Sequence, residues 1–539
     1  MGTYLNPGNS GFEKIRNSIY VDKSGLIEAI NRTIGTMQKL TCISRPRRFG
    51  KSFAAQMLCA YYDKTCDSAV LFDDLEIAEV PGGSYRKHLN QYDVIYLDMT
   101  NIMGESKKDD IVSYIRRKVS EELKDAYPAL QVDEESFSTT LIRTAELAGN
   151  KFIMIIDEWD APIREMQEIQ KAYLDFLRSL FKSSGTTDRI FAAVYMTGIL
   201  PIKKDGSESA ISDFWEYSML EPGEFQPYVG FTEKDVKKLC GEHRLDFEEA
   251  KKWYDGYSFD NVSSVYNPYS IMKAVILKKF KSYWRMSSAA DALEDYISGD
   301  YDGLFVAVLE LLGGFRIPVD TDGFNNDSKL IKNRDDMLTL LIHLGYLAYD
   351  GEEETVRIPN EEIRIEFSKA IREVKSSESV MRLCESRQLI QDTIQMKEAA
   401  VAAQVERIHA EMTDPMHYNN EQSLRSVIQI AYYSYSDYFL KFEELPSGDG
   451  YADVVYFPKK GSRMPVLIIE LKWNQSAEGA IAQIRDKRYF DALKGYGGDI
   501  LLVGISYDRD AGKNKRRHSC VIEKIDCNSL AGIKTEKGR

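Results

Sequence analysis

A tripeptide, Gly50-Lys51-Ser52, stands between an apolar run and a helix-forming segment, and this arrangement constrains the fold more than any other feature of the chain. The run Leu40–Ser44 has the composition of a buried strand, and the residues from Phe53 onward are typical of a helix. The start of a helix offers unpaired backbone N–H groups and a positive dipole end to phosphate. In such a unit Lys51 can reach the β- and γ-phosphates, and the Ser52 hydroxyl can ligate Mg²⁺. The chemistry fits ATP or GTP.

The loop departs from the strict phosphate-binding pattern, G-x-x-x-x-G-K-[ST], because Arg45 stands where the first glycine belongs. A side chain there replaces a hydrogen at a point where the backbone must approach phosphate. Arg47 and Arg48 could compensate by placing charge directly on the phosphates, or they could act on the nucleotide of a neighbouring subunit. A structural role, in which this arginine pair bonds acidic groups at the edge of the sheet, is an open alternative.

Two further apolar runs end in polar residues that suit a nucleotide site. Phe152–Ile156 leads into Asp157, which could hold Mg²⁺ through water, and Glu158, which could orient the attacking water. A later run ends with Thr197, whose hydroxyl could sense the γ-phosphate. Acidic residues at the end of a strand are also common where a strand simply reaches solvent. In this order behind a Gly-Lys-Ser loop, they predict a site for ATP and Mg²⁺.

The pattern of apolar runs predicts several modules, because 539 residues exceed one ordinary core. Strand-like runs alternate with amphipathic helical stretches in the first part, which predicts an α/β domain with a mostly parallel sheet. The middle is mainly helical, as expected for a lid and connector. The boundaries that we predict are 1–224 for the nucleotide domain, 225–404 for the helical part and 405–539 for a compact C-terminal α/β unit.

The loop and several segments around it resemble the AAA-ATPase-like family of bacterial proteins, in which the loop reads Arg-Pro-Arg-Arg-Phe-Gly-Lys-Ser. The matching segments are residues 45–52, Phe12–Arg16, Tyr20–Ser24, Trp253–Tyr257 and Tyr266–Pro268. The resemblance implies a P-loop fold with ATP as the nucleotide. It also leaves a homo-oligomer open, because ATPases of this type often complete their sites with residues of a neighbour. The aromatic segment around Trp253 suits a packed joint between lid and core, although Asp255 could instead face the nucleotide.

A second group of charged residues lies near the end of the chain. Gly450–Phe457 and Pro465–Lys472 predict two strands joined by a polar turn. Because side chains alternate along a strand, Glu470 and Lys472 lie on one face, where Asp453 of the partner strand can converge with them. Two carboxylates can bind a divalent cation that activates water and stabilises charge on a phosphate, and Lys472 can orient or deprotonate that water. The ordinary alternative is a strand that reaches solvent with a cross-strand salt bridge.

The order of elements around this hairpin resembles the core of the PD-(D/E)XK nuclease superfamily, over residues 418 to about 507. Asp453, Glu470 and Lys472 match its signature triplet, and Ala452 stands where the name-giving proline is found in other members. The resemblance implies a restriction-endonuclease-like α/β domain in which Asp453 and Glu470 bind Mg²⁺ or Mn²⁺.

The helices on either side of the hairpin extend this resemblance. Glu421 matches the acidic residue that the first helix often supplies. Gln483 and Tyr489 match the polar and aromatic residues of the helix after the hairpin. The resemblance therefore implies that Glu421 and Gln483 belong to the catalytic group.

A net charge of −14 counts against a protein that coats nucleic acid, because phosphate binding draws on excess Lys and Arg. It leaves room for a local basic surface such as Lys513–His518, although that run could equally be a solvated loop. The chain has no uninterrupted apolar run of about 18 residues and no apolar export segment at its start, and its seven cysteines form no C-x-x-C pair. We therefore expect a cytoplasmic protein with no membrane partner.

The two sites together predict an ATP-binding, metal-dependent nuclease that cuts DNA as the first expectation and RNA as the second. Regulation of cleavage by ATP is a hypothesis motivated by the presence of both sites in one chain. The alternative is an ATP-dependent switch or scaffold whose C-terminal domain binds nucleic acid without cutting it. A helicase-like motor is a third possibility, but no second helicase core is visible in the sequence. A role in the maintenance of mobile elements or in defence against foreign DNA would rest on family analogy alone.

Overall fold

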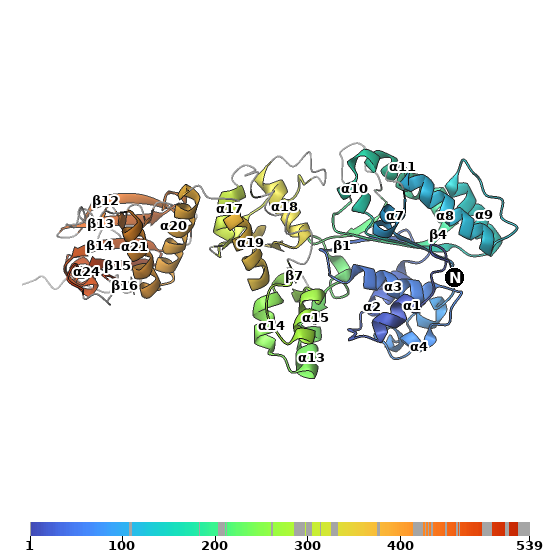
Figure 1. Cartoon of the computed structure of the whole chain (residues 1–539), viewed down its shortest axis with the longest axis horizontal. Coiled ribbons are helices and arrows are strands. Elements are labelled where there is room, and N and C mark those ends of the chain that lie inside the picture. The colour runs from blue at the N-terminus through green and yellow to red at the C-terminus, as the bar shows by residue number, and fades with distance from the viewer. Residues whose placement is uncertain are drawn as a thin grey trace, which may run out of the picture. The chain divides into compact units, whose positions relative to one another are not determined.

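The computed structural model divides the chain into two compact units, Met1–Val374 and Lys375–Arg539 (Figure 1). The residues that it describes are 2–106, 110–182, 184–202, 211, 213–259, 262–284, 297, 304–312, 314–324, 333–373, 378–412, 424–425, 427–428, 431–432, 435–447, 450–459, 462, 464–487, 498–511 and 517–525. The division into three domains, with boundaries at 224 and 404, is still a prediction. In the described part of the chain, no helix is both long enough and apolar enough to cross a membrane.

A five-stranded parallel sheet forms the centre of the N-terminal part of the first unit, with the strand order β2-β3-β4-β1-β5. The strands are β1 (Leu40–Ser44), β2 (Val94–Asp98), β3 (Phe152–Asp157), β4 (Phe191–Gly198) and β5 (Trp215–Tyr217). Strands β1, β3 and β4 are buried along their whole length, as their nearly continuous apolar runs indicated. The predicted α/β fold with a parallel sheet is confirmed for this part of the chain.

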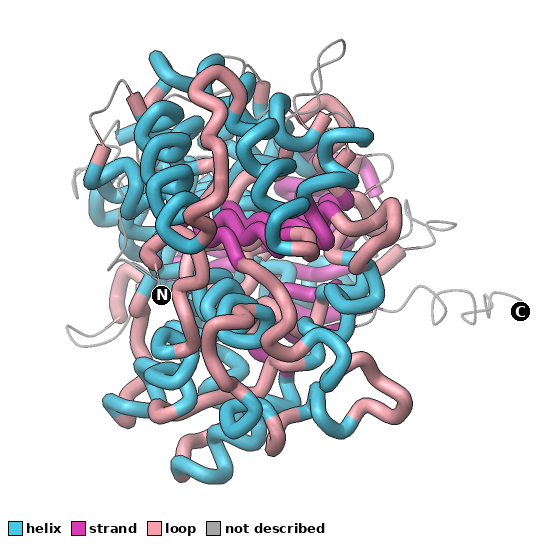
Figure 2. Tube along the Cα trace, turned by 90° about the vertical axis from the view of Figure 1, so that its right-hand side faces the viewer, coloured by secondary structure: helices cyan, strands magenta, loops and turns pink. Residues whose placement is uncertain are grey.

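Helices cover both faces of this sheet. Figure 1 shows α1, α2 and α3 on one face and α7, α8 and α10 on the other, and in Figure 2 the strands nearest the viewer lie between helices. The helices are α1 (Ser10–Arg16), α2 (Gly25–Thr33), α3 (Lys51–Tyr62), α4 (Ala69–Phe72), α5 (Glu76–Glu79), α6 (Tyr85–His88), α7 (Met99–Glu105), α8 (Ile111–Ala126), α9 (Phe137–Ala148), α10 (Ala161–Glu165), α11 (Gln170–Phe181) and α12 (Ser184–Ile190), with short 3-10 turns at Gln167–Ile169 and Gly223–Phe225. Because β4 lies between β1 and β3, these three strands end side by side at the edge that carries the Gly-Lys-Ser loop.

The rest of the first unit is mainly helical and carries two small antiparallel sheets, with the strand orders β6-β8-β7 and β10-β11-β9. The strands are β6 (Phe231–Thr232), β7 (Tyr257–Phe259), β8 (Val262–Tyr266), β9 (Ile317–Pro318), β10 (Ala348–Asp350) and β11 (Thr355–Arg357). The helices are α13 (Glu233–His243), α14 (Phe247–Tyr254), α15 (Pro268–Leu277), α17 (Leu304–Leu312), α18 (Arg334–Leu344) and α19 (Glu361–Glu373). The aromatic segment predicted to be a joint therefore spans the end of α14 and strand β7.

The second unit is built on a mixed five-stranded sheet in the order β12-β13-β14-β15-β16. Its strands are β12 (Phe439–Ser447), β13 (Gly450–Pro458), β14 (Val466–Trp473), β15 (Ile500–Tyr507) and β16 (His518–Ile525). The pair β14 and β15 is parallel and the other pairs are antiparallel, so the predicted hairpin is β13 and β14.

Two hydrophobic clusters lie on opposite faces of this second sheet. One cluster joins the sheet to α20 (Glu378–Ile394) and α21 (Glu398–Met412), and the other joins it to α24 (Ala477–Asp486). A short helix, α23 (Tyr435–Tyr438), precedes β12. The alternation along β14 decides which residues face each side: Leu467, Ile469 and Leu471 pack in the first cluster, while Val466 and Ile468 pack in the second. Continuing the same alternation, Glu470 and Lys472 lie on the α24 face.

Candidate functional sites

The loop between β1 and α3 has two residues in the left-handed backbone region. Gly50 is the N-cap of α3 and has a φ of +92°, and Arg48 has a φ of +68°. A Cβ atom on Gly50 would meet no atom within 4 Å, so the backbone angle rather than space accounts for glycine here. The loop thus turns sharply and presents the N-terminus of α3, which begins at Lys51.

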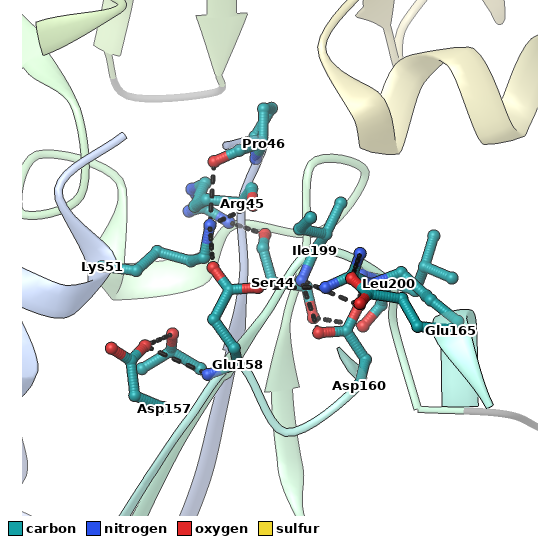
Figure 3. A network of polar contacts seen from close by, with 12 residues as sticks. Ser44, Arg45, Pro46, Lys51, Asp157, Glu158, Asp160, Glu165, Ile199 and Leu200 are labelled. Atoms are coloured by element: carbon teal, nitrogen blue, oxygen red, sulfur yellow. Dashed lines mark hydrogen bonds and ion pairs between the residues drawn. The ribbon is translucent and has the colours of Figure 1, made fainter. Parts of the chain in front are cut away.

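Arg45 is fully buried, and Figure 3 shows its side chain bonded to Ser44, at the end of β1. Its Nη1 donates to the carbonyl oxygens of Ser44, Tyr217 and Ser218 at 2.9, 3.0 and 2.8 Å. The guanidinium carbon lies 5.2 Å from the centre of the Phe259 ring. Burial lowers the pKa of Arg45 to about 10. The side chain that replaces the first glycine therefore ties the loop to the residues at the end of β5.

Lys51 is buried beneath the loop that precedes it. Its Nζ donates to the carbonyl oxygens of Arg45 and Pro46 at 3.0 Å each, and it lies 3.7 Å from Glu158 Oε1 (Figure 3). Burial lowers the pKa of Lys51, although the nearby carboxylates oppose that shift. Phosphate oxygens are acceptors of the same kind as these carbonyls. The loop can therefore present Lys51 to a phosphate.

Ser52, Asp157 and Thr197 meet at the carboxyl edge of the parallel sheet. Thr197 Oγ1 donates to Asp157 Oδ1 at 3.0 Å, and the backbone N–H of Glu158 donates to the same oxygen at 3.1 Å. Burial raises the pKa of Asp157, and a hydrogen bond from Ser52 opposes that shift. A carboxylate and a hydroxyl side by side fit Mg²⁺, which prefers oxygen ligands and keeps several waters. Asp157 and Ser52 are the residues that would hold it.

The carboxylate of Glu158 lies between two cations. Its Oε1 lies 3.7 Å from Lys51 Nζ, and its Oε2 lies 3.1 Å from Arg164 Nη2. Arg164 Nε also donates to Asp160 Oδ2 at 2.9 Å. The sequence analysis did not name Arg164 or Asp160. The signal that could have found them is their spacing of four residues at the start of a helix, which places an Asp and an Arg within reach of each other.

The two loop arginines reach different surroundings. Arg48 Nη1 donates to the carbonyl oxygen of Tyr283 at 3.3 Å, and its guanidinium carbon lies 4.1 Å from the centre of the Tyr269 ring. Arg47 is half-buried. Arg48 thus contacts the helical part of the first unit, a partner that none of the sequence-based alternatives included.

The aromatic segment at β7 also contacts the loop. Phe49 is buried and meets the ring of Tyr257 edge-on at a centroid distance of 5.5 Å. Asp255 accepts hydrogen bonds from the backbone N–H of Gly256 at 2.7 Å and from Ser264 Oγ at 3.0 Å. These contacts support the structural interpretation of the segment, with Asp255 bonded to the adjacent Gly256 and to Ser264 of β8, and Tyr257 packed against the loop.

The second unit brings Asp453, Glu470, Lys472 and Gln483 together. Lys472 Nζ lies 3.0 Å from Glu470 Oε1, and the side-chain amide of Gln483 on α24 donates to the same oxygen. Asp453 Oδ2 accepts a hydrogen bond from the backbone N–H of Leu471 at 2.9 Å. Lys472 and Gln483 therefore contact the same oxygen of Glu470, and Asp453 bonds the backbone of the residue that follows Glu470. The catalytic roles of these residues stay a prediction.

Glu470 lies in an environment that shifts its pKa. Its pKa is raised to about 7, chiefly by burial and then by the charge of Asp453, while Lys472 opposes the shift. Its Oε2 atom is buried and has no hydrogen-bond partner among the described residues. A buried carboxylate oxygen of this kind, beside a second carboxylate, fits a hard divalent cation. Asp453 and Glu470 are the residues that would hold Mg²⁺ or Mn²⁺ there.

Arg425 is a further residue that the sequence analysis missed. Its guanidinium forms an ion pair with Asp453 Oδ1.

Within the described residues, no group of three or more His, Cys, Asp and Glu side chains is arranged to hold a metal ion. Three sequence predictions fall outside the described residues: Glu421, Tyr489 and the basic run over 513–516.

The described end of that basic run has structural partners. His518 Nδ1 lies 2.6 Å from Glu406 Oε2, and Arg517 Nη1 donates to the Tyr507 hydroxyl at 3.2 Å. Burial lowers the pKa of His518. These two residues therefore tie β16 to α21 and β15, which is a packing role.

Residues 7–207 match the family model described as predicted AAA-ATPase. The chain is also similar to a protein of Azotobacter chroococcum mcd 1, described as an uncharacterized protein in the vnfD 5' region. The two are 23% identical over 541 residues, which cover 94% of this chain and 96% of that protein.

Three solved structures of archaeal proteins are also similar. The ORC2 protein of Aeropyrum pernix, in ADPNP–ADP complexes, is 13% identical with a TM-score of 0.31, over 67% of this chain and 98% of that chain. Cdc6p of Pyrobaculum aerophilum is 12% identical with a TM-score of 0.24, over 79% and 84%. The ORC1 protein of Aeropyrum pernix, in complex with DNA, is 10% identical with a TM-score of 0.24, over 65% and 91%. TM-scores this low leave the assignment resting on the family match and on the geometry of the loop. Those two findings support a P-loop ATPase in the N-terminal part of this chain.

Proposed function

We propose that this chain is an ATP-hydrolysing protein whose second unit cuts phosphodiester bonds of nucleic acid with Mg²⁺ or Mn²⁺. The observation that carries the nuclease proposal is that Lys472 and Gln483 both bond one oxygen of the buried Glu470. Asp453 bonds the backbone N–H of the next residue, Leu471. A cross-strand salt bridge alone would explain the contact between Glu470 and Lys472. It would not explain a glutamine from α24 bonded to the same oxygen, or a buried carboxylate oxygen left without a partner among the described residues.

Each residue of this group has a distinct part in the proposed cleavage. Asp453 and Glu470 would hold the cation, which when bound supplies a Lewis acid and a more acidic water. Lys472, held 3.0 Å from Glu470, can take a proton from the attacking water or place positive charge beside the phosphate. Gln483 fixes the orientation of the Glu470 carboxylate. Among the described residues, this site offers a cation only two carboxylates, those of Asp453 and Glu470. The cation would complete its coordination with water, which suits Mg²⁺.

In the first unit, the arrangement suits hydrolysis of ATP. Lys51 and the N-terminus of α3 bind phosphate oxygens, and Asp157 with Ser52 would hold Mg²⁺. Glu158 orients the attacking water. Control of cleavage by the nucleotide remains a hypothesis, motivated by the two sites in one chain and by the contacts of Arg48 and Phe49 with the helical part of the first unit.

A second candidate function is an ATP-dependent switch or scaffold that binds nucleic acid without cutting it. The observation that favours it is that both carboxylates already have cationic partners, Arg425 for Asp453 and Lys472 for Glu470. In this alternative the ion pairs are permanent and no cation binds. The two candidates differ in one measurable property, which is divalent cation binding by the second unit.

The test is an incubation of the purified protein with plasmid, linear and single-stranded DNA and with RNA, in Mg²⁺ or Mn²⁺, with and without ATP. An Asp453→Ala/Lys472→Ala double variant is the control. Cleavage by the unaltered protein and none by the variant would support the nuclease, and the preferred substrate would separate DNA from RNA. Absence of cleavage under all conditions, together with retained binding of nucleic acid, would favour the switch or scaffold.

A further inference from the structure

Arg164 is fixed on one side by a buried acidic residue. Its Nε donates to Asp160 Oδ2 at 2.9 Å, and only 14% of its side chain is exposed. Asp160 itself is almost fully buried and accepts hydrogen bonds from the backbone N–H groups of Ile199 and Leu200 at 3.2 and 3.0 Å (Figure 3). The guanidinium of Arg164 is thereby anchored to the segment that follows β4, which is the strand that carries Thr197.

On its other side, Arg164 holds Glu158. Its Nη2 lies 3.1 Å from Glu158 Oε2. Glu158 has a φ of +53°, a left-handed backbone that costs a residue with a side chain about 1 kcal/mol or more and that occurs where surrounding contacts enforce it. One such contact follows directly, because the backbone N–H of Trp159 donates to the carbonyl oxygen of Thr197 at 2.9 Å.

This backbone turn directs the Glu158 carboxylate back toward Lys51, with 3.7 Å between Glu158 Oε1 and Lys51 Nζ (Figure 3). A glutamate side chain loses more than 1 kcal/mol of rotamer freedom when it is held in one position. An ion pair with an anchored guanidinium can hold it at one oxygen and leave the other for a different partner.

We propose that Arg164 is a positioning residue for ATP hydrolysis, which holds Glu158 by Oε2 so that Oε1 faces the attacking water beside the γ-phosphate. The inference rests on the proposed ATPase function. In the reaction, the water oxygen bonds to the γ-phosphorus as the bond to the bridging oxygen breaks, and ADP leaves with that electron pair. The proton of the water passes by way of Glu158 Oε1 to the released phosphate. Arg164 acts through Glu158 and does not touch the reacting atoms.

The test compares Arg164→Gln, Glu158→Gln and the double variant with the unaltered full-length protein. The measurements are single-turnover ATP hydrolysis, ATP and ADP affinity by titration calorimetry, and thermal unfolding. We expect Arg164→Gln to lower the hydrolysis rate by about 100-fold, since a misplacement of about 1 Å costs a factor of that size. ATP affinity should change by less than about threefold, because the phosphate contacts of Lys51 remain. The double variant should be no slower than Glu158→Gln, because Arg164 has no effect once Glu158 cannot act.

Glu165 offers a matched control. It lies 3.5 Å from Arg164 Nη1 and is half-exposed, so Glu165→Gln removes an ion pair of the same arginine and should leave hydrolysis unchanged. Arg164→Lys keeps the charge but loses the forked geometry. If Arg164→Gln does not fold, the lysine variant takes its place: a rate about tenfold lower with unchanged ATP affinity supports the inference, and an unchanged rate overturns it.

Several outcomes would overturn the inference while leaving the ATPase intact. They are an unchanged hydrolysis rate in Arg164→Gln, an equally large further loss when Arg164→Gln is added to Glu158→Gln, or a selective loss of ATP affinity over ADP affinity. The last result would place Arg164 on the γ-phosphate instead of on Glu158. If the unaltered protein neither binds nor hydrolyses ATP, the proposed ATPase function itself fails.

Discussion

Asp453 on β13 accepts a hydrogen bond from the backbone N–H of Leu471 on β14, with 2.9 Å between Asp453 Oδ2 and the nitrogen. The regular pairing of the two strands ends at Val454 and Ile469, which are one residue after Asp453 and two residues before Leu471. The carboxylate therefore bonds a backbone group at the place where the ladder stops, while its other oxygen pairs with Arg425. Asp453 therefore contributes a hydrogen bond that supports the fold and a negative charge that could bind a cation. A mutational test must separate these two contributions.

Asp453→Asn should separate them, because the amide oxygen can still accept from the Leu471 N–H while the charge is lost. We expect divalent-dependent cleavage to fall by about 100-fold or more, with the melting temperature nearly unchanged. Asp453→Ala removes the acceptor as well and should lower the free energy of unfolding by about 1–3 kcal/mol. Cleavage assays and thermal unfolding of both variants provide the measurement. Full cleavage by the asparagine variant would exclude Asp453 as a catalytic residue.

Arg45→Gly would create the strict glycine-rich loop pattern, yet we expect it to destabilise the protein. The change leaves the partly buried carbonyl oxygen of Tyr217 and the buried one of Ser218 without the donor that Arg45 supplies, and it opens a cavity beside Phe259. The expected loss is about 2–4 kcal/mol in the free energy of unfolding, measured in urea. Arg47→Gly, at a half-buried position of the same loop, is the control and should cost less. A stability equal to that of the unaltered protein would contradict the anchoring role.

Lys51→Met should remove most of the affinity for ATP while keeping the bulk of the side chain in place. The ammonium group donates to carbonyls of the loop and can donate to phosphate oxygens, whereas the thioether cannot. We expect ATP affinity to fall by at least about tenfold, as the loss of one charged hydrogen bond of about 1.5–3 kcal/mol requires. Titration calorimetry measures it, with Lys64→Met, a lysine outside the loop, as the control. An unchanged affinity would remove the phosphate-loop assignment.

Glu362 predicts a pH dependence of stability in the first unit. It accepts hydrogen bonds from the backbone N–H of Tyr283 and from Ser270 Oγ, and burial raises its pKa from 4.5 to about 7. Since the folded-state pKa exceeds the unfolded value, the folded state favours the protonated form. Its stabilisation is complete below about pH 4.5 and is lost as the pH rises through about 7, by about 3 kcal/mol in total.

Glu362→Gln should therefore gain stability relative to the unaltered protein between pH 5 and pH 8, because glutamine does not titrate. Urea unfolding at the two pH values measures the difference between the curves. Glu361→Gln is the matched control on the same helix, since the ion pair with Arg364 lowers the pKa of Glu361 and leaves it charged throughout this range. Parallel pH profiles for Glu362→Gln and the unaltered protein would show that Glu362 titrates normally.

Much of the N-terminal fold could be predicted because its strands are buried on both faces. β1, β2, β3 and β4 appear in the sequence as nearly continuous apolar runs, which is the composition that a central parallel strand requires. β5 was not predicted. Its three residues are half-buried or exposed at the sheet edge, so no apolar run marks it.

In the candidate sites too, some residues could be predicted from the sequence and others could not. Lys51, Asp157 and Thr197 stand directly at helix and strand ends, and parallel strands place such ends at one edge. Glu470 and Lys472 share a face through the two-residue period of a strand. The spacing of four residues links Arg164 to Asp160, but it does not indicate that Arg164 also contacts Glu158. The relevance of Arg425 likewise depends on which carboxylate the folded chain brings beside it.

By itself, the sequence determined the elements whose formation depends on near neighbours: the loop that begins α3, the buried strands and the alternation along β14. The tertiary structure alone decided where Arg45 points, which residues hold Glu158 and what raises the pKa of Glu470. The physical reason is the distance along the chain over which each of these effects acts. Backbone propensity and periodicity act over a few residues, whereas side-chain direction, burial and charge pairing depend on partners that the fold brings together, many of which lie tens or hundreds of residues away along the chain.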